Sequence, residues 1–258
     1  MADSTAPPAP VPGRPQDPAP DGTDAAFRPV RGGNAFEETV ERLLQAIKLG
    51  MVQDGDRLPP ERQLAARLGV SRMTLREAIR DLRRAGYVES RRGRLGGTFV
   101  RYRPVEITAP PADALRRARE LTGSLEDVLA LRRVLEVGAT ELAARRRLSE
   151  QERAYLRERL SDCASCPAGG YRQRDSRLHL ALAELSGSVS LAAAVADARV
   201  RLNDLLDAIP LLPRNIRHSD AQHATVVAAV LAGDPARARQ AMEEHVDGTA
   251  ALLRGFLG

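Results

Sequence analysis

Residues 58–88 read LPPERQLAARLGVSRMTLREAIRDLRRAGYV, and this stretch decides the fold of the first half of the chain. Pro59 and Pro60 suit the entry of a helix, because the first helical turn needs no backbone donor. Gly69 can adopt a positive φ and end that short helix. Ser71 is then placed to cap a second helix by accepting from backbone N–H groups two or three residues on. The stretch therefore predicts a helix-turn-helix.

The second of these helices has an apolar face and a basic end. Leu75, Ile79 and Leu82 recur at helical spacing and predict the buried face. Arg72 and Arg76 lie off that face near the N-terminal end, which is the end that enters the major groove in helix-turn-helix proteins. This arrangement predicts a DNA-binding element.

The segments on either side extend this unit. Residues 87–90 and 98–101 are typical of two short strands, and RRGRLGG lies between them at 91–97. Three arginines in a glycine-rich hairpin tip form a candidate wing that reaches phosphates or the minor groove. Upstream, apolar residues at helical spacing predict a helix that ends near Gly50. The expected DNA-binding domain spans residues 34–103.

Composition and charge agree with a two-domain nucleic-acid-binding protein. The 258 residues are 43% hydrophobic and 3% aromatic, with a net charge of +5. Between Asn34 and Pro104 there are 15 Arg or Lys against 9 Asp or Glu, so one segment holds the basic excess. The chain contains no apolar run of membrane-spanning length and no secretory signal, so we expect a cytoplasmic protein with no membrane partner.

The remaining segments predict a mainly α protein. Residues 1–33 are rich in Pro and Ala and are expected to form a disordered tail, and residues 104–123 a linker with an entry helix. Residues 124–258 are expected to form an all-α antiparallel bundle. Its helices are predicted at about 125–147, 149–163, 171–185, 191–208, 219–231 and 235–257. The first is expected to bury the apolar stripe Val128, Leu131, Leu135, Ala139 and Leu142.

All four histidines of the chain lie in this bundle. Asp175 and His179 are four residues apart on one helix, so they project from the same face. His223 and His245 lie on the last two helices, which a bundle could bring opposite that pair. Three histidines and one aspartate suit Zn²⁺, with Ni²⁺, Mn²⁺ or Fe²⁺ as alternatives. His218 lies about 140° around the helix from His223 and is expected outside the set. Taken singly, each histidine more often fills a surface or satisfied interior position.

Cys163 and Cys166 form a lone CxxC pair. A zinc site needs about four ligands, and the sequence offers no second CxxC. We therefore expect reduced thiols in a loop.

The first half of the chain resembles the winged helix-turn-helix domain of the GntR family over roughly residues 35–101. LPPERQLA, LGVSRMTLREAIRDLRRAGYV and RRGRLGGTFV carry this resemblance, with Met73 standing where relatives often have a small polar residue. Arg72 and Arg76 suit either guanine contacts or phosphate clamping. The resemblance implies that the residues that contact the operator are Arg62, Ser71, Arg72, Thr74, Arg76, Arg92, Gly93 and Arg94.

The second half resembles the effector-binding FCD domain of the FadR subgroup of that family. The matching pieces are LRRVLEVGATELAA at 131–144, DSRLH at 175–179, QH at 222–223 and GDPARARQAMEEH at 233–245. Ser188 and Gln222 depart from residues common in relatives, an Asn and a Glu. The resemblance implies that Asp175, His179, His223 and His245 hold a metal. It also implies that Arg132, with Arg133 as its nearest rival, receives the carboxylate of a small organic acid.

These observations predict a homodimeric transcription regulator, expected to be a repressor, rather than an enzyme. It would bind a palindromic double-stranded operator and respond to a small carboxylate near the metal. One alternative is a metal-dependent hydrolase in which the metal activates water, although no general base is visibly placed. Another alternative is a regulator with a purely structural metal, whose loss would destabilise the fold.

Overall fold

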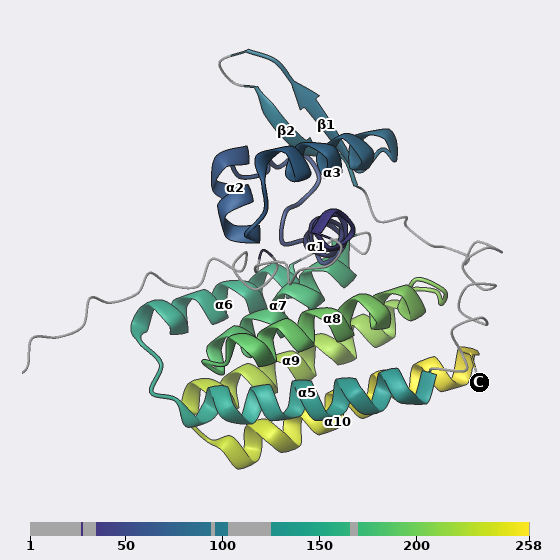
Figure 1. The fold of residues 1–258 in the computed structure, drawn as a ribbon. Coiled ribbons are helices and arrows are strands. Elements are labelled where there is room, and N and C mark those ends of the chain that lie inside the picture. Colours follow the sequence, from purple (N-terminus) through teal and green to yellow (C-terminus); the bar gives the residue numbers. More distant parts are fainter. Residues whose placement is uncertain (1–26, 28–34, 94–95, 103–124, 166–169, 258) are drawn as a thin grey trace, which may run out of the picture.

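The computed structural model describes residue 27 and residues 35–93, 96–102, 125–165 and 170–257. The chain forms a small domain with a projecting hairpin, which stands on a larger helical domain (Figure 1). Most of the predicted tail and the whole of the linker at 104–123 lie outside the described residues. Phe27, which falls within the predicted tail, packs into the core of the small domain.

The small domain contains three helices and one antiparallel hairpin. These are α1 (Ala35–Lys48), α2 (Glu61–Leu68), α3 (Arg72–Arg84), β1 (Val88–Arg91) and β2 (Gly97–Val100). Each strand lies one residue closer to the hairpin tip than predicted, because pairing extends to Arg91 opposite Gly97. The predicted winged helix-turn-helix is confirmed.

Local signals in the sequence account for the helix-turn-helix. Gly69 ends α2 with a left-handed φ of 66°, and the Ser71 hydroxyl accepts from the backbone N–H of Thr74 at 3.0 Å. The predicted face of α3, Leu75, Ile79 and Leu82, is buried. These contacts fix the position of the N-terminal end of α3, which carries side chains that are predicted to contact DNA.

The helical domain is a bundle of six described helices. They are α5 (Leu125–Arg145), α6 (Glu150–Ala164), α7 (Tyr171–Leu185), α8 (Val189–Leu206), α9 (Pro213–Ala232) and α10 (Pro235–Leu257). α7 is buried along most of its length and packs against α5, α6 and α8, so it forms the centre of the bundle. The predicted all-α domain is confirmed. None of the helices in the described ranges is long and apolar enough to cross a bilayer.

The predicted start of α9 was wrong, whereas that of α8 lay two residues from the observed one. α9 begins at Pro213 rather than near Ser219, because proline is compatible with the first turn of a helix. α8 begins at Val189, where the Ser188 hydroxyl accepts from the backbone N–H of Leu191 at 3.2 Å. The earlier start of α9 places His218 within the helix.

Two predictions about burial were also wrong. Cys163 lies in α6 and is buried, not in a loop, whereas Cys166 falls outside the described residues. Leu131 and Leu142 of α5 are 40% and 43% exposed, although periodicity predicted them in the core. The inner face of α5 instead carries polar residues, among them Arg132 and Glu136, because the bundle encloses a polar site.

α1 joins the two domains. Arg42 and Gln45 both donate to Oδ1 of Asp197 in α8, at 3.0 and 2.8 Å. Lys48 donates to Asp204, also in α8, at 3.2 Å. Leu49, directly after α1, is buried against apolar side chains of α5, α7 and α8. A movement of α8 would therefore be transmitted to the small domain.

Candidate DNA-binding surface and metal centre

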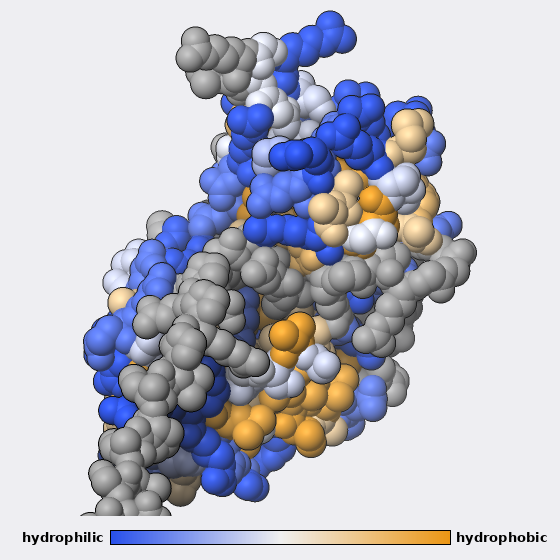
Figure 2. Space-filling view, turned by 60° about the vertical axis from the view of Figure 1, so that its left-hand side comes forward, coloured by the Kyte–Doolittle hydropathy of each residue, from blue (hydrophilic) through white to orange (hydrophobic). Residues whose placement is uncertain are grey.

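The predicted DNA-contacting residues gather on the outer part of the small domain. Arg62, Ser71, Arg72 and Arg76 are exposed, and Thr74 is half-buried. On the face seen in Figure 2, hydrophilic side chains cover much of this domain beside a few hydrophobic ones. The residues predicted to contact DNA therefore lie on a projecting, basic surface, and such a surface suits contact with a polyanion.

Several of these side chains also have partners within the domain. Ser71 and Thr74 hydroxyls lie 2.8 Å apart at the start of α3, and Arg76 Nε lies 2.7 Å from Glu61 Oε2. Arg92 and Gly93 are exposed at the wing, and Arg94 lies outside the described residues. Met73 is 64% exposed beside Arg72. Contact of each residue with DNA stays a prediction.

The four predicted metal ligands meet in the helical domain. α7 supplies Asp175 and His179, α9 supplies His223, and α10 supplies His245. One ligand atom from each lies within 4.8 Å of the others, and all four side chains are buried. His223 Nε2 lies 3.3 Å from both Asp175 Oδ1 and His179 Nε2. Ligands of one tetrahedral zinc ion stand about 3.4 Å apart, so the donor set fits such an ion.

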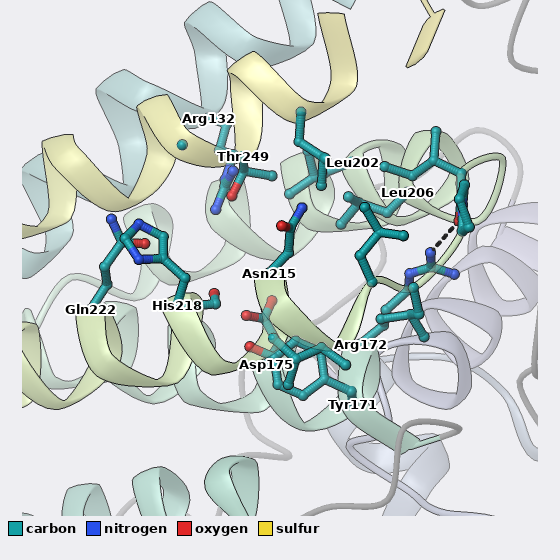
Figure 3. Close-up of a pocket in the computed structure, with 18 residues that line it drawn as sticks. Arg132, Tyr171, Arg172, Asp175, Leu202, Leu206, Asn215, His218, Gln222 and Thr249 are labelled. Atoms are coloured by element: carbon teal, nitrogen blue, oxygen red, sulfur yellow. Dashed lines mark hydrogen bonds between the residues drawn. The ribbon is translucent and has the colours of Figure 1, made fainter. Parts of the chain in front are cut away.

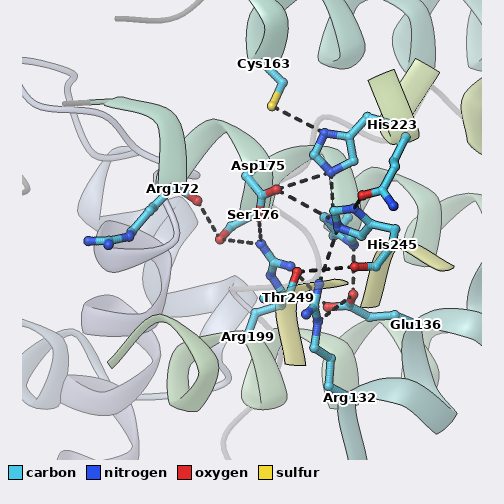
Figure 4. A network of polar contacts seen from close by, with 12 residues as sticks. Arg132, Glu136, Cys163, Arg172, Asp175, Ser176, Arg199, His223, His245 and Thr249 are labelled. Atoms are coloured by element: carbon cyan, nitrogen blue, oxygen red, sulfur yellow. Dashed lines mark hydrogen bonds and ion pairs between the residues drawn. The ribbon is translucent and has the colours of Figure 1, made fainter. Parts of the chain in front are cut away.

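A buried polar network holds these ligands in place (Figure 4). Glu136 Oε2 lies 2.9 Å from His179 Nδ1, so Nε2 of that ring faces the other ligands. Arg199 pairs with Asp175 and lies 3.3 Å from Glu136, and Arg132 Nε donates to Glu136 at 3.1 Å. The network fixes both the orientation and the charge of the ligand set.

The sequence reasoning missed Glu136 and Arg199. Glu136 follows Arg132 by one helical turn, and this i, i+4 spacing could have marked them as a pair on one face. Arg199 follows a run of small apolar residues and carried no comparable signal.

The protonation states suit metal binding. Burial alone would raise the pKa of Glu136, but the charges of Arg132 and Arg199 and the contact with His179 outweigh it and hold that pKa well below its usual range. For Asp175 burial is likewise outweighed, chiefly by Arg199, and the pKa is lowered. Burial lowers the pKa of His179 to about 4 and, with the neighbouring histidines, lowers that of His245. At neutral pH these groups are ionised carboxylates and neutral imidazoles, the forms that bind a cation.

Two further side chains contact the ligand histidines. Gln222 Oε1 lies 3.3 Å from His245 Nδ1, so an amide orients this ring. Cys163 Sγ lies 3.9 Å from His223 Nδ1. Cys163 therefore belongs to the surroundings of the metal centre, a position that the sequence did not reveal.

A cavity of about 270 Å³ opens beside the ligands (Figure 3). Arg132 and Asp175 line it, as does His218, which is not among the four converging ligands. Arg132 is 1% exposed, and its Nη1 has no hydrogen-bond partner among the residues that the structure describes. The neighbouring Arg133 instead lies at the surface, paired with Asp247 and Glu243. The unsatisfied donor next to the cavity is suited to an oxyanion ligand.

The fold and surfaces define a class of protein: a winged-helix DNA-binding domain attached to a helical ligand-binding domain. Residues 36–100 match the bacterial regulatory proteins of the gntR family, and residues 127–248 match the FCD domain. The chain belongs to the GntR family of transcription regulators, in the subgroup with an FCD domain, and this is a family of regulators rather than enzymes.

Individual relatives agree with this assignment. The RmpR protein of Mycobacterium gastri, named as an HTH-type transcriptional regulator, is 33% identical over 80% of this chain and 76% of its own length. A protein of Escherichia coli K12 named for regulation of the L-lactate dehydrogenase operon is 31% identical over 85% of this chain and 86% of its own. The solved structure of E. coli McbR/YncC aligns over 87% of this chain and 99% of its own, with a TM-score of 0.50 and 21% identity, and supports the fold.

Proposed function

We propose that this regulator binds its operator as a repressor and that a small carboxylate, bound beside a metal in the helical domain, weakens this binding. One observation carries the proposal: Asp175, one of four converging candidate ligands, lines the same cavity as Arg132, whose Nη1 has no hydrogen-bond partner among the described residues. Asp175, His179, His223 and His245 would hold the metal, with Zn²⁺ best suited to the donor set. The metal would supply positive charge that draws in the carboxylate.

The route from cavity to DNA runs through α8. This helix carries Arg199, which pairs with the ligand Asp175, and also Asp197 and Asp204, which hold α1. Leu202 and Leu206 of the same helix line the cavity. A ligand that shifts α8 would alter the position of α1 and with it the placement of α3 on DNA.

The DNA partner is proposed to be a palindromic operator in the bacterial cytoplasm, read by a homodimer. On α5, Leu131, Val134 and Leu142 form an exposed apolar stripe, and Val134 is 72% exposed. Gly138 lies on the same face, and an added Cβ there would meet nothing within 4 Å. The stripe would bury itself against a second copy in a two-fold contact.

The experiment uses the full chain loaded with Zn²⁺ and an operator selected from a random DNA pool. Anisotropy of labelled DNA would report binding while simple carboxylates, among them L-lactate and hexanoate, are titrated. We expect at least one carboxylate to weaken DNA binding at least tenfold. Arg132→Ala should keep DNA affinity and lose the response, because it removes the anchor but no DNA contact. The control Arg133→Ala, altered at the surface, should keep both.

Two results would contradict the proposal. The protein should contain stoichiometric zinc and Asp175→Ala should lose it. An unchanged zinc content in that variant would contradict the assignment of Asp175 and its neighbours as metal ligands. If the carboxylate response persists undiminished in Arg132→Ala, Arg132 does not anchor the carboxylate.

A further inference from the structure

The cavity beside the metal centre is polar at one end and apolar at the other. Arg132, Thr249, Gln222 and His218 lie on one side of the cavity and Leu202 and Leu206 on the other, with Asn215 between them and Asp175 beside Tyr171 (Figure 3). The aliphatic side chains that line it are Leu202, Leu206, Ile209, Pro210, Leu211, Leu212, Ile216 and Leu252.

Three helices contribute to the apolar end. Leu206 comes from α8, Ile216 from α9 and Leu252 from α10, so the body of a ligand in the cavity would contact mostly aliphatic side chains, with Asn215 as a polar neighbour. Arg172 also lies at this end, but its guanidinium is already engaged by Asp207 at 2.8 Å and by the carbonyl of Ile209 at 2.7 Å. This cation is therefore not presented as a second anchor for a charged group.

The chemistry of this end restricts the ligand. Hydroxyl groups placed against leucine and isoleucine side chains lose hydrogen bonds to water without replacement, and a second carboxylate there would be costlier still. A methylene group in the same place gains free energy by leaving water. The same cavity can therefore distinguish two acids that share an identical carboxylate.

We infer that the effector is a monocarboxylate with an apolar body, such as a short aliphatic or aryl-substituted acid, rather than a sugar acid or a dicarboxylate. The carboxylate end of this inference rests on the proposed function, in which Arg132 and the metal anchor that group. The apolar end rests independently on the leucines and isoleucines of α8, α9 and α10. Affinity is expected to rise about fourfold for each added methylene until the cavity is filled.

The test is calorimetric titration of the zinc-loaded full chain with matched ligands. Hexanoate and gluconate both contain six carbons and one carboxylate, and they differ in hydroxyl groups along the body. Propanoate, butanoate and hexanoate vary the length alone, and hexan-1-ol lacks the carboxylate. Leu206→Asn replaces two methyl groups by an amide while keeping the branching of the side chain, and Leu191→Asn is the same substitution in α8 outside the cavity.

We expect hexanoate to bind at least tenfold more tightly than gluconate and more tightly than propanoate. Leu206→Asn should weaken hexanoate about tenfold and propanoate little, and Leu191→Asn should change neither. If gluconate binds more tightly than hexanoate and Arg132→Ala abolishes this binding, the inference of an apolar body is wrong. The proposed carboxylate anchor would then still stand. Equal binding of hexan-1-ol and hexanoate would support the apolar body and contradict the anchor. Failure of all these ligands to bind would overturn both.

Discussion

Arg132 and Arg133 are adjacent in the sequence and have opposite environments. Arg132 is buried beside the cavity, whereas Arg133 pairs with Asp247 at the surface. The sequence could rank these two arginines only by resemblance, because periodicity assigned Leu131 of the same helix to the wrong side. The convergence of Asp175, His179, His223 and His245 was expected from the i, i+4 spacing of the first two and from the resemblance to the FCD domain, and their binding of a metal stays a prediction. Glu136 had only its i, i+4 spacing from Arg132 as a signal, and Arg199 had none, because its burial depends on partners from other helices.

At the residue scale, Glu136→Gln should weaken metal binding by about 10- to 100-fold. The substitution removes the negative charge that faces His179 Nδ1 and fixes the orientation of that ring. Competition against a chelating dye would measure the change, with circular dichroism to verify folding. Glu141→Gln, on the same helix but at its partly exposed face, is the control. Zinc affinity that is equal in both variants would show that Glu136 has no such role.

A second residue-scale prediction concerns the turn before α3. Gly69 adopts a φ of 66°, a conformation that side chains with a Cβ adopt at a cost. Gly69→Ala should therefore lower the free energy of unfolding by about 1–2 kcal/mol. Chemical denaturation would measure it, with Ala66→Gly at an exposed position of α2 as a comparison of ordinary helix propensity. An unchanged midpoint in Gly69→Ala would contradict the strain argument.

At the scale of elements, the sequence predicted which helices exist better than where they begin or which face is buried. Capping residues correctly predicted where α3 and α6 begin. At the start of α6, Ser149 and Glu152 form a reciprocal capping box. The start of α9 was predicted too late along the chain, because proline can stand after the end of one helix and also at the beginning of the next. The spacing of apolar residues predicted the wrong buried face for α5, because an exposed apolar stripe and a buried one have the same period. Contacts between domains, such as Arg42 with Asp197, join distant residues and left no local pattern.

The junction between α1 and α8 supplies a prediction at this scale. Asp197→Asn should weaken the coupling between effector and operator, because it removes the charge that holds Arg42 and Gln45. Effector affinity and basal zinc content should be nearly unchanged, while the shift in DNA affinity on effector binding falls at least threefold. Anisotropy with and without effector measures this ratio. Glu150→Gln, at an exposed position of α6, is the control, and an unaltered ratio in Asp197→Asn would exclude this route.

At the scale of the whole molecule, the exposed stripe on α5 predicts the oligomeric state. Val134→Arg should convert a dimer to a monomer and weaken operator binding, since two half-sites would no longer be bound together. Light scattering during size-exclusion chromatography measures the mass. Val189→Arg, at an equally exposed valine on α8, tests whether an added charge alone has this effect. A Val134→Arg protein that remains dimeric would place the interface elsewhere.

Metal removal provides a second whole-molecule prediction. A chelator should leave the bundle folded, because Arg132 and Arg199 already face Glu136 and Asp175 and the buried charges are paired. The Tm should rise with added zinc, since the metal binds the folded chain. Effector affinity should fall at least tenfold in the stripped protein. Complete unfolding on chelation would instead support a purely structural metal.

The pairing of two guanidinium groups with two carboxylates has one more consequence. The buried network is electrically neutral by itself when the imidazoles are uncharged, so a bound dication adds an excess of positive charge in a region of low dielectric. An incoming carboxylate would reduce that excess, and each of the two proposed ligands would therefore favour binding of the other. Gene expression under this regulator would then follow the joint supply of an organic acid and a metal ion, and a cell short of the metal would be insensitive to the acid.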